Sequence, residues 1–211
     1  MSAPAILTTV VGSYPIPAWL AAFPTATALR DAILVVLKTQ ELAGLDVIAD
    51  GELSRFNISH PETNGMIDYF ISRMSGIRTK FSISDIDEFR ADTQLKYRTD
   101  PAGIVHDAVG DGVLNLARDY DFTKGLTDRQ LKFTCTGPHM LTKVLTDRFY
   151  KDRGELCMAI AQVLRRQMER IGAEVIQIDE ANISGHPEDR EWALPAINHV
   201  LDGVRGKRGV H

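Results

Sequence analysis

The chain has 211 residues, of which 44% are hydrophobic and 25% charged, and its formal net charge is -4. This composition is typical of a globular protein with one sizeable core, and the charge excludes the basic surface of a nucleic-acid-binding protein. No apolar run approaches the ~20 residues that cross a bilayer. The first 24 residues lack the basic start of a signal peptide. Cys135 and Cys157 have no metal-binding spacing, so we expect free thiols in a reducing cytoplasm.

Strand and helix patterns alternate along the chain. The first predicted strand, residues 7–11, ends in a turn, and a helix then begins at Thr25 or Thr27 and ends near Gly44. Further strands are predicted at 46–49, 130–135 and 174–179, with helices at 66–74, 114–120, 156–171 and 192–201. The last residues, 210–211, are the possible onset of a fifth strand. Repeated strand–helix units predict a parallel sheet with helical crossovers.

Residues 77–98 depart from this order. Residues 77–83 and 93–98 both alternate with a period of two, as strands with one buried face do. We therefore expect an antiparallel excursion here, in the form of a hairpin that covers one end of the domain.

The predicted fold class is α/β, of the (β/α)8 TIM-barrel type. A complete barrel needs roughly 250 residues, and this chain offers four strands and the onset of a fifth. We therefore expect residues 1–211 to form a single partial TIM-barrel catalytic domain, equivalent to the first half to five-eighths of the barrel.

The strand at 174–179 delivers two adjacent carboxylates, Asp179 and Glu180, at its C-terminal end. Because side chains alternate along a strand, Gln177 and Asp179 share one face and point into the barrel. Charge at the end of a buried strand costs free energy, and in parallel α/β folds this end is where ligands bind. Asp179 is therefore a candidate binding residue.

The other strands also end in polar residues. Ser13 follows the first strand, Asp50 and Glu52 follow the second, and His139 follows the third. The simpler alternative is that each carboxylate caps a helix or lies in a surface loop. For four successive strands together, one polar rim is the better interpretation.

Four segments of the chain, which include these strand ends, resemble a known family. They are Thr8-Thr9-Val10-Val11-Gly12-Ser13-Tyr14-Pro15, Gly44-Leu45-Asp46 through Asp50-Gly51-Glu52, Thr136-Gly137-Pro138, and Ile176-Gln177-Ile178-Asp179-Glu180. In this order they resemble the cobalamin-independent methionine synthase family, and more narrowly its short, single-barrel members.

The resemblance implies a barrel enzyme in which zinc holds a substrate thiol as thiolate and the sulfur takes a methyl group. Val11, Gly12 and Ser13 match the loop that contacts the carboxylate end of homocysteine. Glu52 and Asp179 match the acidic residues that hold its ammonium group. The implied function is zinc-dependent methyl transfer to homocysteine or a similar small thiol.

The resemblance also implies a zinc site, of which His211 matches the first ligand. The family's other ligands, two cysteines and a glutamate, have no counterpart in these 211 residues. One histidine does not make a zinc site, so we expect the remaining ligands to lie beyond the chain end or on another chain.

The methyl donor and the reaction stay open at this point. Val144 stands where folate-using enzymes have a stacking tryptophan, and Ser184-Gly185 stands where they have Arg-Glu. These two differences count against methyltetrahydrofolate, and the resemblance implies a corrinoid protein as the other candidate donor, so both donors stay open. One alternative function is epoxide opening by the coenzyme M thiol. The other is an inactive half-barrel that self-associates or pairs with a missing half.

Overall fold

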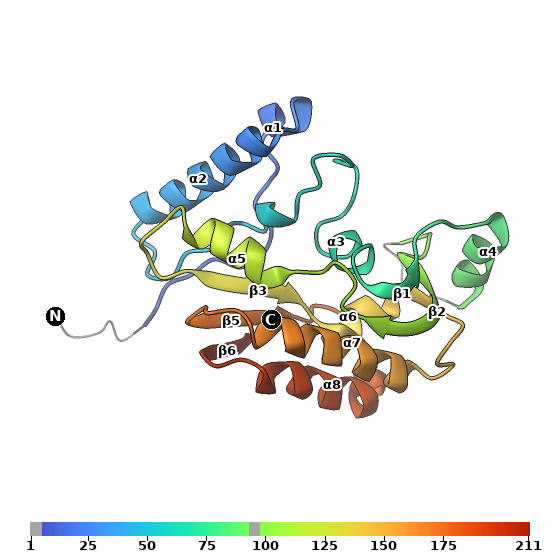
Figure 1. The fold of residues 1–211 in the computed structure, drawn as a ribbon. Coiled ribbons are helices and arrows are strands. Elements are labelled where there is room, and N and C mark those ends of the chain that lie inside the picture. The colour runs from blue at the N-terminus through green and yellow to red at the C-terminus, as the bar shows by residue number, and fades with distance from the viewer. Residues whose placement is uncertain (1–5, 93–97) are drawn as a thin grey trace.

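The computed structural model describes residues 6–92 and 98–211 (Figure 1). The helices are α1 (Ala18–Ala22), α2 (Ala26–Leu42), α3 (Asp68–Ile71), α4 (Ile83–Asp92), α5 (Leu116–Lys124), α6 (Pro138–Lys143), α7 (Arg153–Met168) and α8 (Arg190–Asp202), and short 3-10 turns are η1 (Leu53–Arg55), η2 (Ile183–Gly185) and η3 (Pro187–Asp189). The strands are β1 (Ser75–Arg78), β2 (Gly103–Gly110), β3 (Lys132–Thr136), β4 (Leu145–Asp147), β5 (Val175–Asp179) and β6 (Lys207–Val210).

The main sheet is parallel, with the strand order β3-β5-β6. Two isolated parallel bridges, Thr9 to Val47 and Ile48 to Leu131, continue the same order towards the N-terminus. Five parallel segments therefore lie side by side in the order in which they occur along the chain. The α/β class and the parallel order are confirmed, but the predicted strands 7–11 and 46–49 are reduced to these bridges.

A second small sheet has the order β1-β2-β4, in which β1 is antiparallel to β2 and β4 is parallel to it. An antiparallel excursion is thus present, and among the described residues the partner of β1 is β2. β1 pairs with β2, with Ile77 opposite Val105, and α4 occupies residues 83–92. Of the predicted strand 93–98, all but Arg98 lies outside the described residues.

The long helices follow from local sequence signals. Thr25 caps α2, since its side-chain oxygen accepts a hydrogen bond from the amide of Ala28 at 3.1 Å. Ile33, Val36 and Leu37 of α2 are fully buried. α7 begins after the cap residue Asp152 and buries one stripe of apolar side chains. It packs beside α8 along β5 and β6, while α2 and α5 lie near the N-terminal segments (Figure 1). The core fills the space between these helices and the sheet.

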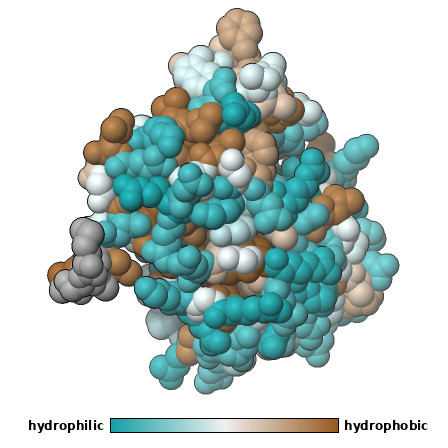
Figure 2. Space-filling model, turned by 60° about the vertical axis from the view of Figure 1, so that its left-hand side comes forward, coloured by the Kyte–Doolittle hydropathy of each residue, from teal (hydrophilic) through white to brown (hydrophobic). Residues whose placement is uncertain are grey.

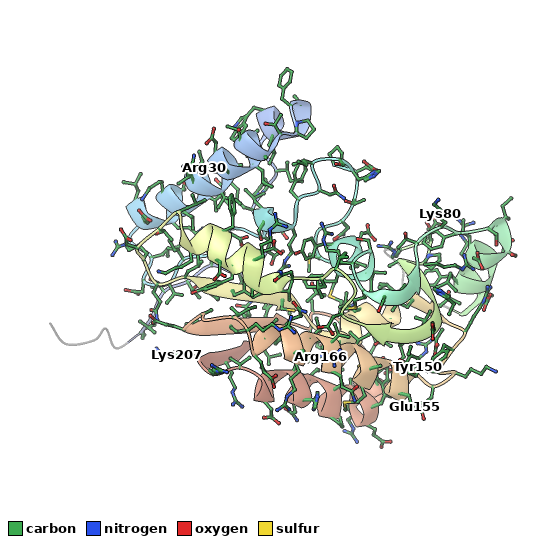
Figure 3. The ribbon with its side chains drawn as sticks, in the orientation of Figure 1. Arg30, Lys80, Tyr150, Glu155, Arg166 and Lys207 are labelled. Atoms are coloured by element: carbon green, nitrogen blue, oxygen red, sulfur yellow. The ribbon has the colours of Figure 1, made fainter. Side chains whose placement is uncertain are left out.

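Hydrophilic groups cover most of the face in Figure 2, and apolar groups gather towards its upper part, the end at which α1 and α2 lie. Trp19, Phe23 and Leu42 of this region are exposed. The charged side chains of α7 and β6, such as Arg166 and Lys207, lie on the outside (Figure 3). Within the described ranges, no helix combines the length and apolar character needed to cross a membrane.

Candidate functional site

Glu52 is a buried carboxylate held by an unusual backbone. Ser13 donates a hydrogen bond from Oγ to Oε2 of Glu52 at 2.5 Å. The carboxylate of Asp50 accepts the amides of Glu52 and Ser54, at 2.8 and 3.2 Å. Gly51 and Glu52 both have left-handed backbones, with φ of 65° and 64°. For a residue with a Cβ this conformation costs about 1 kcal/mol or more. Such strain persists where the surroundings fix it, often at functional sites.

Arg55 balances the charge of Glu52 inside the protein. Its side chain is 4% exposed, and Nη1 lies 3.6 Å from Oε2 of Glu52. Nη2 donates to the backbone oxygen of Thr134 and to its Oγ1, the latter at 2.9 Å. The guanidinium also lies over the Phe70 ring, 5.1 Å from its centroid. Arg55 was not among the residues predicted from the sequence. An arginine three residues after a candidate carboxylate was the available signal.

Asp179 lies at the end of β5, on the same face of the strand as Gln177. Oδ1 accepts a hydrogen bond from Nε2 of Gln177 at 2.6 Å, and Gln177 in turn contacts Lys132. Burial raises the pKa of Asp179, and the hydrogen bond from Gln177 opposes this rise. The negative charge of Glu52 also raises it, so the two predicted carboxylates influence one another. Lys132, a lone lysine in a predicted strand, was also missed.

The loop 11–13 and the nearby cavity complete this group of residues. Ser13 reaches Glu52, while the side chain of Val11 is half exposed. A cavity of about 230 Å³ adjoins Ser13 and Glu52, and Tyr14, Phe56 and other residues also line it. Asp179 does not line this cavity. Carboxylates backed by buried cations can bind an ammonium group at such a rim.

His211 lies beside Asp179. Its amide donates to the backbone oxygen of Ile178 at 3.0 Å, and its backbone oxygen accepts from the amide of Glu180 at 2.7 Å. Nδ1 lies 3.5 Å from Oδ1 of Asp179, and the side chain is 56% exposed. The position of His211 is therefore fixed by the strand ladder, while its imidazole stays accessible.

The described residues do not fit a zinc ion at this rim, since they offer His211 and no cysteine beside it. Burial raises the pKa of Cys135 to about 12, and that of Cys157 to about 12, so neither is a ready thiolate.

A separate group of possible ligands, His186, Glu188 and Asp189, has atoms within 4.8 Å of one another. Asp189 already contacts His139 Nε2 and accepts from Lys143 Nζ, both at 2.9 Å. A cation so close to its oxygen makes Asp189 a poor ligand.

Glu180 points away from Asp179, as the alternation of side chains predicted. Its carboxylate accepts the backbone amides of His139 and Met140, at 2.8 and 3.0 Å, and so caps α6. Gly137 makes this approach possible, because a Cβ there would lie 2.2 Å from Oε1 of Glu180. The predicted rim residue His139 is fully buried. It therefore supports α6 instead of facing the rim.

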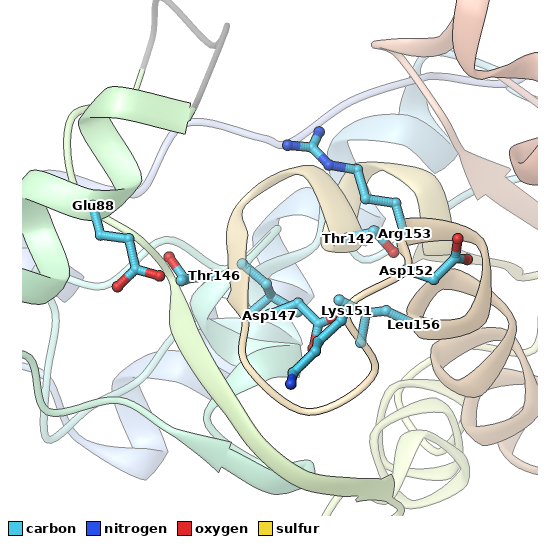
Figure 4. Close-up of a pocket in the computed structure, with 9 residues that line it drawn as sticks. Glu88, Thr142, Thr146, Asp147, Lys151, Asp152, Arg153 and Leu156 are labelled. Carbon is cyan, nitrogen blue, oxygen red and sulfur yellow. The ribbon is translucent and has the colours of Figure 1, made fainter.

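Other cavities lie apart from this cluster. One of about 210 Å³ lies between β4 and the start of α7, with Asp147, Lys151 and Asp152 on its wall (Figure 4). Another, of about 590 Å³, lies between α2 and α5. Neither is lined by any of the predicted binding residues, so neither is the candidate site.

The comparisons with known proteins agree with one another. The model of the family "Cobalamin-independent synthase, Catalytic domain" matches residues 6–198. The methionine synthase of Sulfurisphaera tokodaii is 29% identical over 227 residues, which cover 99% of this chain and 61% of that protein. The methionine synthase of Thermococcus kodakarensis is 29% identical over 232 residues, which cover 100% of this chain and 62% of that protein.

A solved structure shows the same likeness. It is a B12-independent methionine synthase from Shewanella sp. W3-18-1 in complex with selenomethionine. It has a TM-score of 0.77 and 25% sequence identity, and the match covers 97% of this chain and 60% of that chain. The chain thus spans about three fifths of the length of the relatives it matches.

Proposed function

Because this chain belongs to the cobalamin-independent synthase family, in the part formed by the catalytic domain, we propose that it holds homocysteine in a methyltransferase of the methionine-synthase type. The reaction moves a methyl group from a donor to the thiol sulfur of homocysteine, and the thiol proton is lost. In this proposal residues 1–211 are one domain and supply part of a (β/α)8 barrel, with the five parallel segments as successive barrel strands.

The observation that carries the proposal is the pair of buried carboxylates at the strand ends, Glu52 and Asp179. Each is surrounded by donors that keep it in place: Ser13 and Arg55 for Glu52, and Gln177 for Asp179. Such a pair suits an ammonium group, which donates three hydrogen bonds and accepts none. We assign Val11, Gly12 and Ser13 to the carboxylate end of the same amino acid. The relative that was solved with selenomethionine supports a ligand of this class.

For the metal, we propose that His211 contributes one zinc ligand and that the other ligands come from outside these 211 residues. Its accessible imidazole and its place beside Asp179 support this assignment. For the donor we propose a methylfolate. The description of the family as cobalamin-independent gives no support to a corrinoid partner.

Epoxide opening by coenzyme M is the second candidate, and the same carboxylates weigh against it. Coenzyme M carries a sulfonate and no ammonium group, so it would meet repulsion from Glu52 and Asp179. A substrate with an ammonium group is therefore the better fit.

The test is methionine formation from L-homocysteine. The protein tested is this chain joined to the portion of a relative that this chain does not cover, and it is loaded with Zn²⁺. The donors are methyltetrahydrofolate, methylcobalamin or neither. We expect turnover with methyltetrahydrofolate, and a loss of at least about 100-fold in kcat/KM for Glu52→Gln, since an ionic hydrogen bond is replaced by a neutral one. The variant Glu62→Gln, at an exposed site, is the control. No turnover with either donor would overturn the proposal.

A further inference from the structure

Lys132 is a buried charged residue. The proposed binding of the substrate assigns it no direct contact. Lys132 is the first residue of β3, and only 3% of its surface is exposed. Nζ donates to the backbone oxygen of Val10 at 2.5 Å and to Oε1 of Gln177 at 2.8 Å. Burying an ammonium group is costly. Burial accordingly lowers the pKa of Lys132, against the opposing charges of Asp179 and Glu52.

The ammonium group decides which way the amide of Gln177 faces. It can only donate hydrogen bonds, so it requires the amide oxygen. The amide nitrogen must then face the other way, and there it donates to Oδ1 of Asp179 at 2.6 Å. If the amide were flipped, its NH2 would face the ammonium and its oxygen would face the carboxylate. Both contacts would be repulsive. The amide of Gln177 therefore has a single orientation between Lys132 and Asp179.

The same ammonium joins two parts of the proposed substrate site. Val10, whose backbone oxygen it binds, immediately precedes the loop 11–13, which we assigned to the carboxylate end of the ligand. Asp179, which it reaches through Gln177, was assigned to the ammonium end. Lys132 therefore fixes the loop relative to the carboxylate of Asp179, through its hydrogen bonds to Val10 and Gln177.

We propose that Lys132 and Gln177 are positioning residues, which fix the carboxylate of Asp179 in the orientation that binds the ammonium group of the substrate. This inference rests on the function proposed above. A lysine needed for stability alone would be replaceable by an apolar residue without a selective effect on ligands that carry an ammonium group.

The experiment is calorimetric binding of two ligands to the 211-residue chain: L-methionine, and 4-(methylthio)butanoate, which lacks the ammonium group. For Lys132→Met we expect affinity for L-methionine to fall at least about tenfold, the value of one weakened ionic hydrogen bond. Affinity for the deaminated ligand should stay unchanged. Gln177→Met should behave in the same way, and the double variant should be no weaker than either single one, because the two residues act as one chain.

Two further variants complete the design. Lys207→Met removes an exposed lysine at the start of β6 (Figure 3). Lys207 pairs with Val175 of β5, which in turn pairs with Lys132, so the two lysines occupy equivalent positions in the sheet. This variant should bind both ligands as the parent does. Lys132→Gln keeps a hydrogen-bonding side chain if Lys132→Met fails to fold. It should also lose selectivity for the ammonium ligand, since a neutral amide lets Gln177 face either way.

The outcomes separate the two proposals. A parent chain that binds L-methionine no better than the deaminated ligand would overturn the proposed function. A selective parent whose Lys132 variants keep the same selectivity, or lose affinity for both ligands equally, would overturn the positioning role.

Discussion

Gly137 and Glu180 show how a single residue can control the end of a neighbouring helix. The carboxylate of Glu180 reaches the free amides of α6 only because residue 137 has no Cβ. Glu180 is 1% exposed, so its carboxylate has no room to move aside. Asp179, the adjacent residue on β5, keeps its position in the site partly because Glu180 anchors the segment that follows.

We therefore expect Gly137→Ala to destabilise the protein by about 3 kcal/mol, as two charge-assisted hydrogen bonds are lost. The matched control is Gly172→Ala, because nothing lies within 4 Å of a Cβ at that residue. It should change the free energy of unfolding by no more than about 0.5 kcal/mol. Urea unfolding followed by far-UV circular dichroism measures both. Equal stability of the two variants would show that Glu180 does not depend on this glycine.

At the scale of secondary-structure elements, α2 offers a direct test of capping. The sequence left Thr25 and Thr27 open as cap residues, and the structure places the cap at Thr25. Thr25→Ala should cost about 1 kcal/mol, because the amide of Ala28 loses its acceptor. Thr27 is exposed and lies inside α2. Thr27→Ala should be neutral or slightly stabilising, since alanine has the higher helix propensity. Thermal unfolding of both variants decides between them, and a larger loss for Thr27→Ala would contradict the assignment.

Some helices and strands could be predicted from the sequence, and others could not. α2, α7 and β5 were predicted because periodicity and caps are local signals. The shared strand face of Gln177 and Asp179 followed from the alternation of side chains. β2 was missed, since His106 and Asp107 interrupt its apolar residues. The pairing of β1 with β2 spans more than 20 residues, and no local pattern specifies such a partner.

Within the candidate site, the predicted residues were those at strand ends, and the missed ones were their counter-charges. Arg55 lies in a turn and Lys132 at the start of a strand, where a lone cation normally faces water. Only the assembled structure shows that both are buried, Arg55 against Glu52 and Lys132 linked to Asp179 through Gln177. The charge balance of a site depends on residues distant in sequence, so it could not be read from any one motif.

At the scale of the whole molecule, the main sheet has an edge at β6. Within residues 6–92 and 98–211, β6 pairs with β5 alone. The amides of Lys207 and His211 bind towards β5, so by alternation those of Arg208 and Val210 face the open edge. Open strand edges and exposed apolar side chains such as Val210 favour association between chains.

We expect this chain to self-associate in a concentration-dependent manner, and Val210→Pro to reduce the association. Proline removes the amide that faces the open edge and leaves the bonds to β5 in place. Val210→Thr keeps that amide and serves as the control. Sedimentation velocity over a range of concentrations measures the effect. A monomeric parent chain, or equal association of the two variants, would contradict the role of this edge.

The order of the parallel segments also has a consequence for how the protein is made. Each segment, from Thr9 through Val47, β3 and β5 to β6, lies beside the one that precedes it along the chain. During synthesis on a ribosome, a new segment therefore finds its neighbour already exposed and never has to insert between two earlier ones. The sheet can grow in one direction as the polypeptide emerges, which limits the time that an apolar face waits for its cover.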